Sequence, residues 1–485
     1  MRFKVIFNTT GIILKFISLI FILPVIFAFI YKDISSICYF VLAGVVSLIF
    51  GFLFCLNDAS EKDIDNITRA EAFATVIFGW VMFGLVCTIP FLFYGLNFID
   101  SLFEAFSGVS TTGATILSDF SLYPETFFLY RSIIQWFGGM GIIVLFIAVL
   151  PKFAVAGRQM FFAEIPNPRE EKITPRIRHT ASWLWSMYIL LTIIEIIILK
   201  VQGLDLYNAL CLSLSTISAG GFSNHPTGLI GFDSKIIWTI GIFAFIAGIN
   251  FLLTYKVLIK GKINELFRSE EFRAYFLIVM FFTLLFSLIL YFQGNFSISD
   301  SIRNAFFETA ATITSTGAAC DNFLNWPIRA KVLLFVLMFV GGSAISASGS
   351  IKITRWIYVF KFIKKEMNKV AHPSAIYPIK LENRTVSPDI GYQIIVFIIF
   401  FMAIFALSSI AVSFIEQNVL LAVTGSIATL SNAGPGLDNV IGPVGSYASL
   451  KIPTKLIFMF NMVVGRLEII PFLALLQKDL WQFKK

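Results

Sequence analysis

Charged and metal-binding residues are scarce in this sequence. Asp, Glu, Lys and Arg make up only 14% of its 485 residues, whereas soluble proteins carry about a quarter. The five cysteines lie apart, in or beside apolar segments, and form no CxxC pair and no cluster with the three histidines. This spacing gives little support to a disulfide framework or to a metal site.

The residues of a catalytic site are also lacking. No acid, base and nucleophile converge within an apolar segment, where Glu195 and Glu468 stand alone. No glycine-rich phosphate loop follows a strand, because GGMGII at 138–143 lies inside an apolar run and is typical of helix packing. We therefore expect neither an enzyme nor a protein with a resident cofactor.

Apolar residues are abundant instead, at 57% of the chain with 55 phenylalanines. A helix needs about 20 apolar residues to cross a bilayer. Ten segments qualify: 9–31, 37–56, 72–96, 126–150, 180–202, 234–258, 273–293, 329–360, 390–415 and 453–477. The sequence therefore predicts an all-α polytopic protein of the lipid bilayer, with both termini on the same side.

Basic residues gather on one side of this predicted topology. The loops 151–179, 256–273 and 352–384 carry most of the Lys and Arg. By the positive-inside rule, these loops and both termini are cytoplasmic. The net charge of +8 is then a topology signal, and its spread over short loops argues against nucleic-acid binding. The opposite side is comparatively acidic, which would raise the local concentration of cations.

Four stretches of the chain align without a gap. They read DSLFEAFSGVSTTG, NALCLSLSTISAGG, NAFFETAATITSTG and LAVTGSIATLSNAG, and they end at Gly113, Gly221, Gly317 and Gly434. Each lies between two long apolar spans and is too short to cross, so it is predicted to re-enter as a half-helix and a glycine turn. The half-helices are expected near 101–111, 206–218, 301–314 and 420–430. Four such copies predict one pore with pseudo-fourfold symmetry.

The glycine turns suit a cation filter. A dehydrated cation needs close oxygen ligands, which rings of backbone carbonyls supply in potassium channels. Carbonyls can point inward only through dihedrals that glycine allows, and neighbouring hydroxyls add ligands or brace the turn. Tight helix packing would explain the glycines but not their common frame. The predicted filter residues are Thr111, Thr112, Gly113, Ala219, Gly220, Gly221, Ser315, Thr316, Gly317, Asn432, Ala433 and Gly434.

Several strings together carry a family resemblance. They are FSGVSTTGAT, STISAGGFSNH, ITSTGAACDN, ATLSNAGPGLDN, QWFGGMGIIVL, GINFLLTYK, SIKITRW and GRLEI. With them the chain resembles the membrane subunit of bacterial Trk potassium uptake systems, in the wider family of Trk, Ktr and plant HKT transporters. Its four filter glycines, none replaced by serine, are similar to the potassium-selective pattern of that family. The second and fourth turns lack the Thr-Thr-Gly form, so the four carbonyl layers can be chemically unequal.

The resemblance implies uptake of potassium, the transported ion, across the bacterial cytoplasmic (inner) membrane. It also implies a homodimer and a separate cytosolic nucleotide-binding regulatory subunit. Two alternatives share such repeats: a sodium-coupled Ktr-type transporter and the potassium-binding subunit of a P-type pump. The two extra N-terminal spans favour the Trk branch. We divide the chain into these two spans at 1–60 and four repeats at 61–155, 156–262, 263–370 and 371–485.

Two features are candidates for a gate. The string GGSAISASGSIK at 341–352 interrupts an apolar span with residues that break a helix, although a small-residue helix contact is the alternative. The family resemblance makes this string an intramembrane loop that obstructs the pore below the filter. Arg466 lies in an apolar span, where a charge is costly and functional by default, unless it pairs with Glu468 or snorkels. The predicted gate residues are Gly341, Gly342, Ser343, Ser346, Ser348, Gly349, Lys352 and Arg466.

Overall fold

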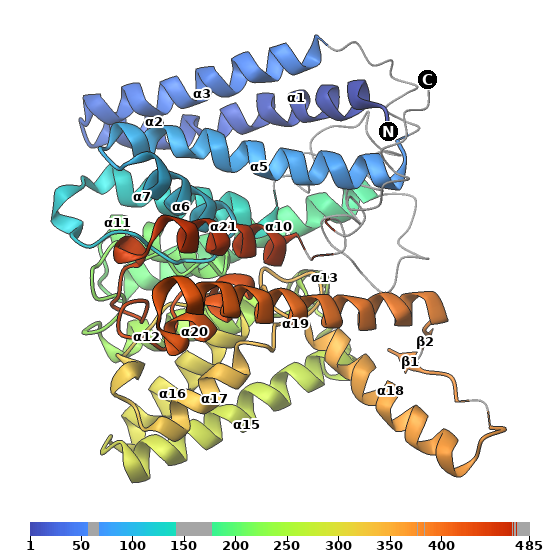
Figure 1. The fold of residues 1–485 in the computed structure, drawn as a ribbon. Helices are drawn as coiled ribbons and strands as arrows, with labels where there is room; N and C mark the ends of the chain where they lie inside the picture. The colour runs from blue at the N-terminus through green and yellow to red at the C-terminus, as the bar shows by residue number, and fades with distance from the viewer. Residues whose placement is uncertain are drawn as a thin grey trace.

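The computed structural model describes residues 1–56, 67–141, 177–375, 377–382, 384–467, 469 and 472. This part of the chain is almost entirely helical, with one two-stranded sheet (Figure 1). The long helices and half-helices are α1 (Phe3–Ile20), α2 (Ile22–Ile30), α3 (Ile34–Cys55), α5 (Arg69–Phe93), α6 (Phe98–Val109), α7 (Glu125–Met140), α10 (Ile177–Val201), α11 (Leu206–Ile217), α12 (Ser234–Ala247), α15 (Glu270–Gln293), α16 (Ile298–Ile313), α17 (Ile328–Leu337), α18 (Ile353–Ala371), α19 (Pro388–Glu416), α20 (Val419–Leu430) and α21 (Ile452–Arg466). The shorter elements are α13 (Phe251–Leu258), α14 (Ile263–Arg268), the 3-10 turns Phe120–Leu122, Phe323–Asn325 and Tyr447–Ser449, and the antiparallel strands β1 (Lys380–Leu381) and β2 (Arg384–Thr385).

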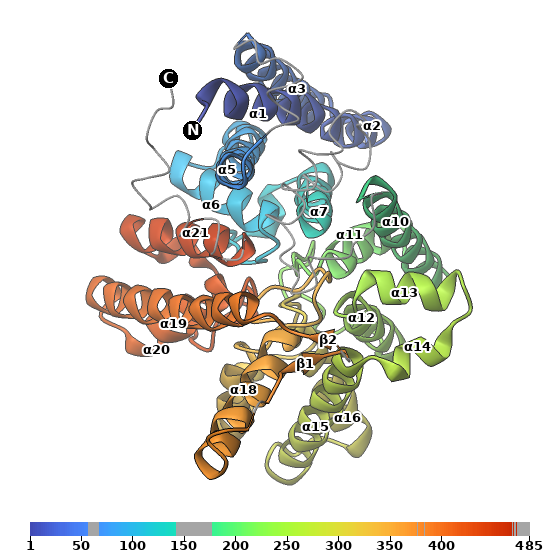
Figure 2. The same ribbon diagram turned by 90° about the vertical axis from the view of Figure 1, so that its right-hand side faces the viewer.

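Helices α1, α2 and α3 form a hairpin against the outside of α5 (Figure 2). Asp33, between α2 and α3, caps α3 by accepting a hydrogen bond from the Ser36 backbone N–H at 3.2 Å. The same carboxylate accepts a hydrogen bond from Thr126 Oγ1 at 2.5 Å, at the start of α7. A polar contact thus ties the apolar hairpin to the helices that follow it.

Six helices of the described residues are long and apolar enough to cross a bilayer: Phe3–Ile30 (α1 with α2), Ile34–Cys55, Ala70–Phe93, Ala181–Val201, Glu270–Gln293 and Pro388–Glu416. The chain is therefore a multi-pass membrane protein. The predicted crossings at 126–150 and 453–477 run beyond the described residues, within which α7 ends at Met140 and α21 at Arg466.

The prediction of one continuous span at 234–258 is wrong. Helix α12 ends at Ala247, and α13 begins at Phe251 at an angle of 110° to it. Asn250 caps the new helix α13, because its side-chain oxygen accepts a hydrogen bond from the Leu252 backbone N–H at 3.0 Å. The two helices make a broken span.

The four half-helices α6, α11, α16 and α20 are built alike. Each packs against the long helix that precedes it, and the four helix groups surround the centre of the molecule (Figure 2). Each begins with a side chain that accepts a hydrogen bond from the backbone N–H three residues on; these caps are Asn97, Asp205, Ser297 and Asn418. The first and third half-helices start three residues earlier than predicted, because the caps lie further upstream.

Neighbouring repeats meet through a recurring contact. The helix after one turn packs on the half-helix of the next repeat: α7 on α11, α12 on α16, and α21 on α6. At the junction of the third and fourth repeats, the segment that follows α17 takes this place, since Gly349 lies against Ser431 at the end of α20. The ring of repeats closes, but one of its four junctions is built differently.

Candidate functional site

The four glycine turns have nearly the same backbone conformation. The residue that ends each half-helix has φ between −74° and −81°. The next residue has φ between +54° and +57°, and the glycine two positions later has φ between +65° and +81°. The left-handed residues that are not glycine are Thr111, Ala219, Ser315 and Asn432. A left-handed conformation is an outlier for a β-branched residue such as Thr111. The sequence analysis required this conformation only of the glycines and missed it at these four positions.

The four turns close into a ring, called here the turn ring (residues 110–113, 218–221, 314–317 and 431–434). Each glycine faces the carbonyl oxygen of the residue before the glycine of the next repeat. A Cβ on these glycines would lie 2.3 Å from Gly220 O for Gly113, 1.8 Å from Thr316 O for Gly221, 1.9 Å from Ala433 O for Gly317 and 2.5 Å from Thr112 O for Gly434. No side chain fits at any of the four positions, and the last contact joins the fourth repeat back to the first.

Side chains hold the ring from outside. Asn432 donates one amide N–H bond to Thr112 Oγ1 at 2.9 Å and another to Met462 O at 3.0 Å, which links the fourth turn to the first. Tyr447 donates its hydroxyl to Gly434 O at 2.7 Å. Sequence reasoning placed Asn432 in the filter but missed Tyr447, because it lies thirteen residues after its partner in a segment without a repeat.

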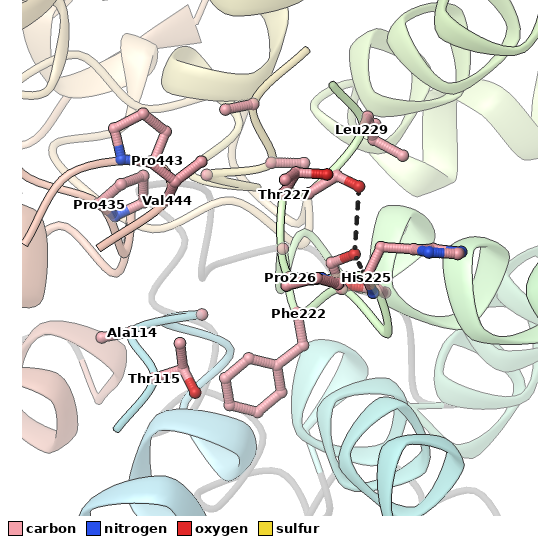
Figure 3. A pocket seen from close by; sticks show the side chains of 18 of the residues that line it. Ala114, Thr115, Phe222, His225, Pro226, Thr227, Leu229, Pro435, Pro443 and Val444 are labelled. Carbon is pink, nitrogen blue, oxygen red and sulfur yellow. Dashed lines mark hydrogen bonds between the residues drawn. The ribbon is translucent and has the colours of Figure 1, made fainter. Parts of the chain in front are cut away.

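The residues that follow each glycine line a cavity of about 480 Å³ on one side of the ring (Figure 3). No Asp or Glu is among the described residues of its wall, so the acidic residues expected on this side do not surround the ring directly. Arg131 lines the cavity, but its guanidinium pairs with the Glu104 carboxylate at 2.7 Å. The pKa of His225 is lowered, because the effect of its burial outweighs the opposing charge of Asp205; the neutral imidazole is therefore favoured. The cavity wall is therefore mostly neutral.

The segment 338–352 lies on the other side of the ring, between α17 and α18. A Cβ on Gly349 would lie 2.2 Å from Ser431 O, and the Gly349 N–H donates to Ser315 Oγ at 2.6 Å. The segment therefore contacts the residues that precede the glycines of the third and fourth turns. It is a loop, not the helix contact considered as the alternative, and all the predicted gate residues except Arg466 lie in it.

Hydrogen bonds within this loop and to its neighbours hold it in place. Within it, the Gly341 N–H donates to Ile351 O at 2.9 Å, and Lys352 donates its ammonium to Ser348 O. Two further bonds anchor it to neighbouring helices. The Ala344 N–H donates to Glu271 Oε1 of α15 at 2.5 Å, and the Ser343 N–H donates to Gly248 O at 2.9 Å.

Arg466, at the end of α21, bridges this loop and α7. Its Nη1 donates to Ala347 O at 2.9 Å, and its Nη2 donates to Gly138 O at 2.7 Å and Gly139 O at 2.5 Å. The predicted alternative partner, Glu468, lies outside the described residues. The Gly138–Gly139 pair also packs tightly, since a Cβ on Gly138 would lie 1.9 Å from Val109 O. The GGMGII string, which the sequence indicated to be a packing feature, thus also supplies carbonyl acceptors for Arg466.

In the part of the chain that the structure describes, six apolar spans, four half-helices and a closed ring of backbone carbonyls define an α-helical multi-pass transport protein. Comparison with known proteins gives the family. A family model described as "Cation transport protein", TrkH, matches residues 36–482, and the chain belongs to this family.

Relatives match over the whole chain. The Trk system potassium uptake protein TrkH of Escherichia coli K12 is 34% identical, and the alignment covers 99% of this chain and 100% of that protein. The protein of the same name from Vibrio parahaemolyticus is 32% identical over the same shares of the two chains. The crystal structure of the potassium transporter TrkH from Vibrio parahaemolyticus superposes with a TM-score of 0.88 at 29% identity, over 99% of this chain and 100% of that one.

Proposed function

We propose that this protein takes up potassium across the bacterial cytoplasmic membrane, with the turn ring as its selectivity filter. The observation that carries the proposal is the closure of the ring. Four left-handed glycines each face a carbonyl oxygen of the next repeat, from Thr112, Gly220, Thr316 and Ala433. Such a ring offers oxygen ligands in place of the water around a cation. The names of its relatives, Trk system potassium uptake proteins, support potassium as that cation.

The loop at 338–352 and Arg466 form the gate of this proposal. The loop contacts the turns where Ser315 and Ser431 precede the glycines, and Arg466 joins it to α7. A guanidinium next to an ion path repels a cation, because it keeps its charge in practice. A cavity of about 60 Å³ lined by Ser346, Gly349 and Arg466 supports a narrow, closed passage here.

The proposal includes the arrangement in the membrane and the assembly. Both termini and the basic loops face the cytoplasm by the positive-inside rule. The chain divides into two N-terminal spans and four repeats with boundaries near 60, 155, 262 and 370. Two copies form a dimer, and a separate cytosolic nucleotide-binding subunit regulates it. The word "system" in the names of the relatives supports additional subunits.

The test is ion flux into liposomes that contain the purified protein. Rubidium-86 serves as the probe for potassium, with and without competing sodium, under an imposed membrane potential. We expect rubidium entry that follows the potential and resists an excess of sodium. A flux that requires sodium would favour the sodium-coupled alternative, and no flux above protein-free liposomes would contradict the proposal.

A further inference from the structure

The second turn of the ring lacks a brace that the first and third turns share. In those turns the hydroxyl three residues before the glycine lies 2.7 Å from the hydroxyl one residue before it. The bonded pairs are Ser110 with Thr112 and Thr314 with Thr316. The second turn has Ser218 at the first of these positions but Gly220 at the second, so this bond cannot form. Two adjacent glycines also leave the peptide between them freer to rotate than any other in the ring.

A buried glutamine from another repeat takes over this task. Gln135 lies on α7 of the first repeat and is 0% exposed. Its Nε2 donates to Gly220 O at 2.6 Å, while its Oε1 accepts from Ser215 Oγ at 3.0 Å and from the Phe222 N–H at 3.2 Å. One amide therefore holds the chain before and after the glycine pair, and directs the carbonyl between them.

The shapes of Gln135 and Gly220 depend on each other. A Cβ on Gly220 would lie 2.5 Å from Gln135 Cδ. On α12 of the second repeat, Ala244 occupies the position that Gln135 has on α7. The match follows from the glycine four residues after each of them: Gly139 faces Ser218 at the end of α11, and Gly248 faces Thr314 at the end of α16. The third turn combines this small residue with Thr316. The large Gln135 therefore lies beside Gly220, which has no side chain. The small Ala244 takes the same place for Thr316, whose hydroxyl is already bonded to that of Thr314.

We propose that Gln135 is a positioning residue that determines ion specificity, because it holds the Gly220 carbonyl in the turn ring. This oxygen is the one that faces Gly113. Without the amide, the Gly220–Gly221 peptide can rotate and remove one oxygen from the ring, and a ring with variable ligands distinguishes potassium from sodium less well. The inference rests on the proposed function of the ring as a filter.

The test uses three variants in liposomes, with rubidium and sodium fluxes measured separately. Gln135→Ala should reduce the ratio of rubidium to sodium flux about tenfold, as expected when the Gly220 carbonyl loses its buried hydrogen bond from this amide. Gly220→Thr alone should lower folded protein, because its Cβ meets Gln135. The double variant Gln135→Ala/Gly220→Thr reproduces the Ala244 and Thr316 combination, and should bring the ratio back to within about threefold of the wild type.

Gln202→Ala is the matched control, because the amide of Gln202, directly after α10, donates a bond of similar length to Thr239 Oγ1 of α12 at 2.7 Å, away from the ring. It should leave the flux ratio unchanged. A selective wild type with an equally selective Gln135→Ala variant would overturn this inference alone. A lowered ratio that the double variant does not restore would assign Gln135 to general packing and overturn it too. A wild type that does not discriminate between the ions would overturn the proposed function as well.

Discussion

The turn ring and the helices that follow its four turns keep the fourfold symmetry to very different degrees. In the ring, φ at the left-handed non-glycine position varies only from +54° to +57°. The helices after the ring are less alike. Within the described residues α12 breaks by 110° after Ala247 and α17 gives way to a loop after Leu337, whereas α7 and α21 are continuous up to Met140 and Arg466.

This difference follows from what each region has to do under the proposed function. Each glycine of the ring is in contact with a carbonyl of the next repeat, so a change in one turn displaces its neighbour. Closing a passage needs only one obstacle, and one repeat can supply it. Divergence of the four copies is therefore tolerated below the ring, where the third repeat contributes the loop and the fourth contributes Arg466.

The largest effect on ion selectivity should come from a side chain in the ring. Gly221→Ser and Gly317→Ser would place a Cβ 1.8 Å and 1.9 Å from the next carbonyl oxygen, and we expect rubidium over sodium selectivity to fall at least about tenfold. In Gly113→Ser and Gly434→Ser the added Cβ would lie 2.3 Å and 2.5 Å from the carbonyl oxygen, and we expect a smaller loss of selectivity there. The measurement is the flux ratio in liposomes.

Gly95→Ser is the control for these variants, since Gly95 also has a positive φ of +92° but has nothing within 4 Å of an added Cβ. It tests the backbone strain without the clash. If Gly221→Ser kept the selectivity of Gly95→Ser, the turn ring would not be the filter.

Among the residues that differ between the four repeats, Arg466 should have a large effect on the rate of ion flux. Two unit charges about 6 Å apart interact by about 3 kcal/mol at an effective dielectric near 20, so Arg466→Ala should speed rubidium flux up to about a hundredfold. Arg466→Lys keeps the charge and should retain most of the barrier. The measurement is initial flux at equal amounts of folded protein.

The lysine variant separates two explanations of the barrier. Arg466 donates to Ala347 O and to the carbonyls of Gly138 and Gly139 at once, which a lysine cannot reproduce in the same planar arrangement. A lysine variant as fast as the alanine variant would assign the barrier to these bonds, and not to the charge. An alanine variant no faster than wild type would remove Arg466 from the gate.

Glu104 and Glu308 are equivalent carboxylates of the first and third repeats. They each lie nine residues before a ring glycine, and each accepts a backbone N–H at 3.0 Å, from Ile116 and Cys320. Only Glu104 has an ion pair among the described residues, with the buried Arg131 at 2.7 Å. Glu104→Gln leaves that charge unpaired and should cost about 3–5 kcal/mol of stability, whereas Glu308→Gln should cost about 1 kcal/mol or less.

Thermal unfolding in detergent measures both carboxylate variants. Equal losses of melting temperature would mean that the two repeats carry their carboxylates in the same way, despite the missing arginine. A greater loss for Glu308→Gln would contradict the prediction outright.

The smallest effect should come from the contact between the two regions. Ser315 Oγ accepts the Gly349 N–H at 2.6 Å and so joins the ring to the loop. Ser315→Ala leaves this N–H unpaired at a cost of about 1 kcal/mol, and should raise rubidium flux about fivefold by releasing the loop. Thr111→Ala is the matched control, because Thr111 Oγ1 at the same position of the first turn has no hydrogen-bond partner among the described residues. Equal flux in both variants would argue against this coupling.

The sequence predicted well those features that depend on local pattern. The common frame ending at Gly113, Gly221, Gly317 and Gly434 indicated four half-helices with turns, and the structure contains them. The starts at Phe98 and Ile298 were placed three residues late, because Asn97 and Ser297 cap these helices outside the aligned frame. The break after Ala247 was missed, since one glycine and one asparagine hardly alter the hydropathy of the segment.

By itself the sequence determined the membrane class, the four repeats and the positions where only glycine can stand, because apolar length and backbone conformation are local properties. Which groups meet was decided by the tertiary structure alone. Arg466 binds carbonyls 119 and 328 residues away, and Gln135 holds a carbonyl 85 residues away. Backbone carbonyls are present in every residue and leave no mark in the sequence, so only packing selects those that become partners.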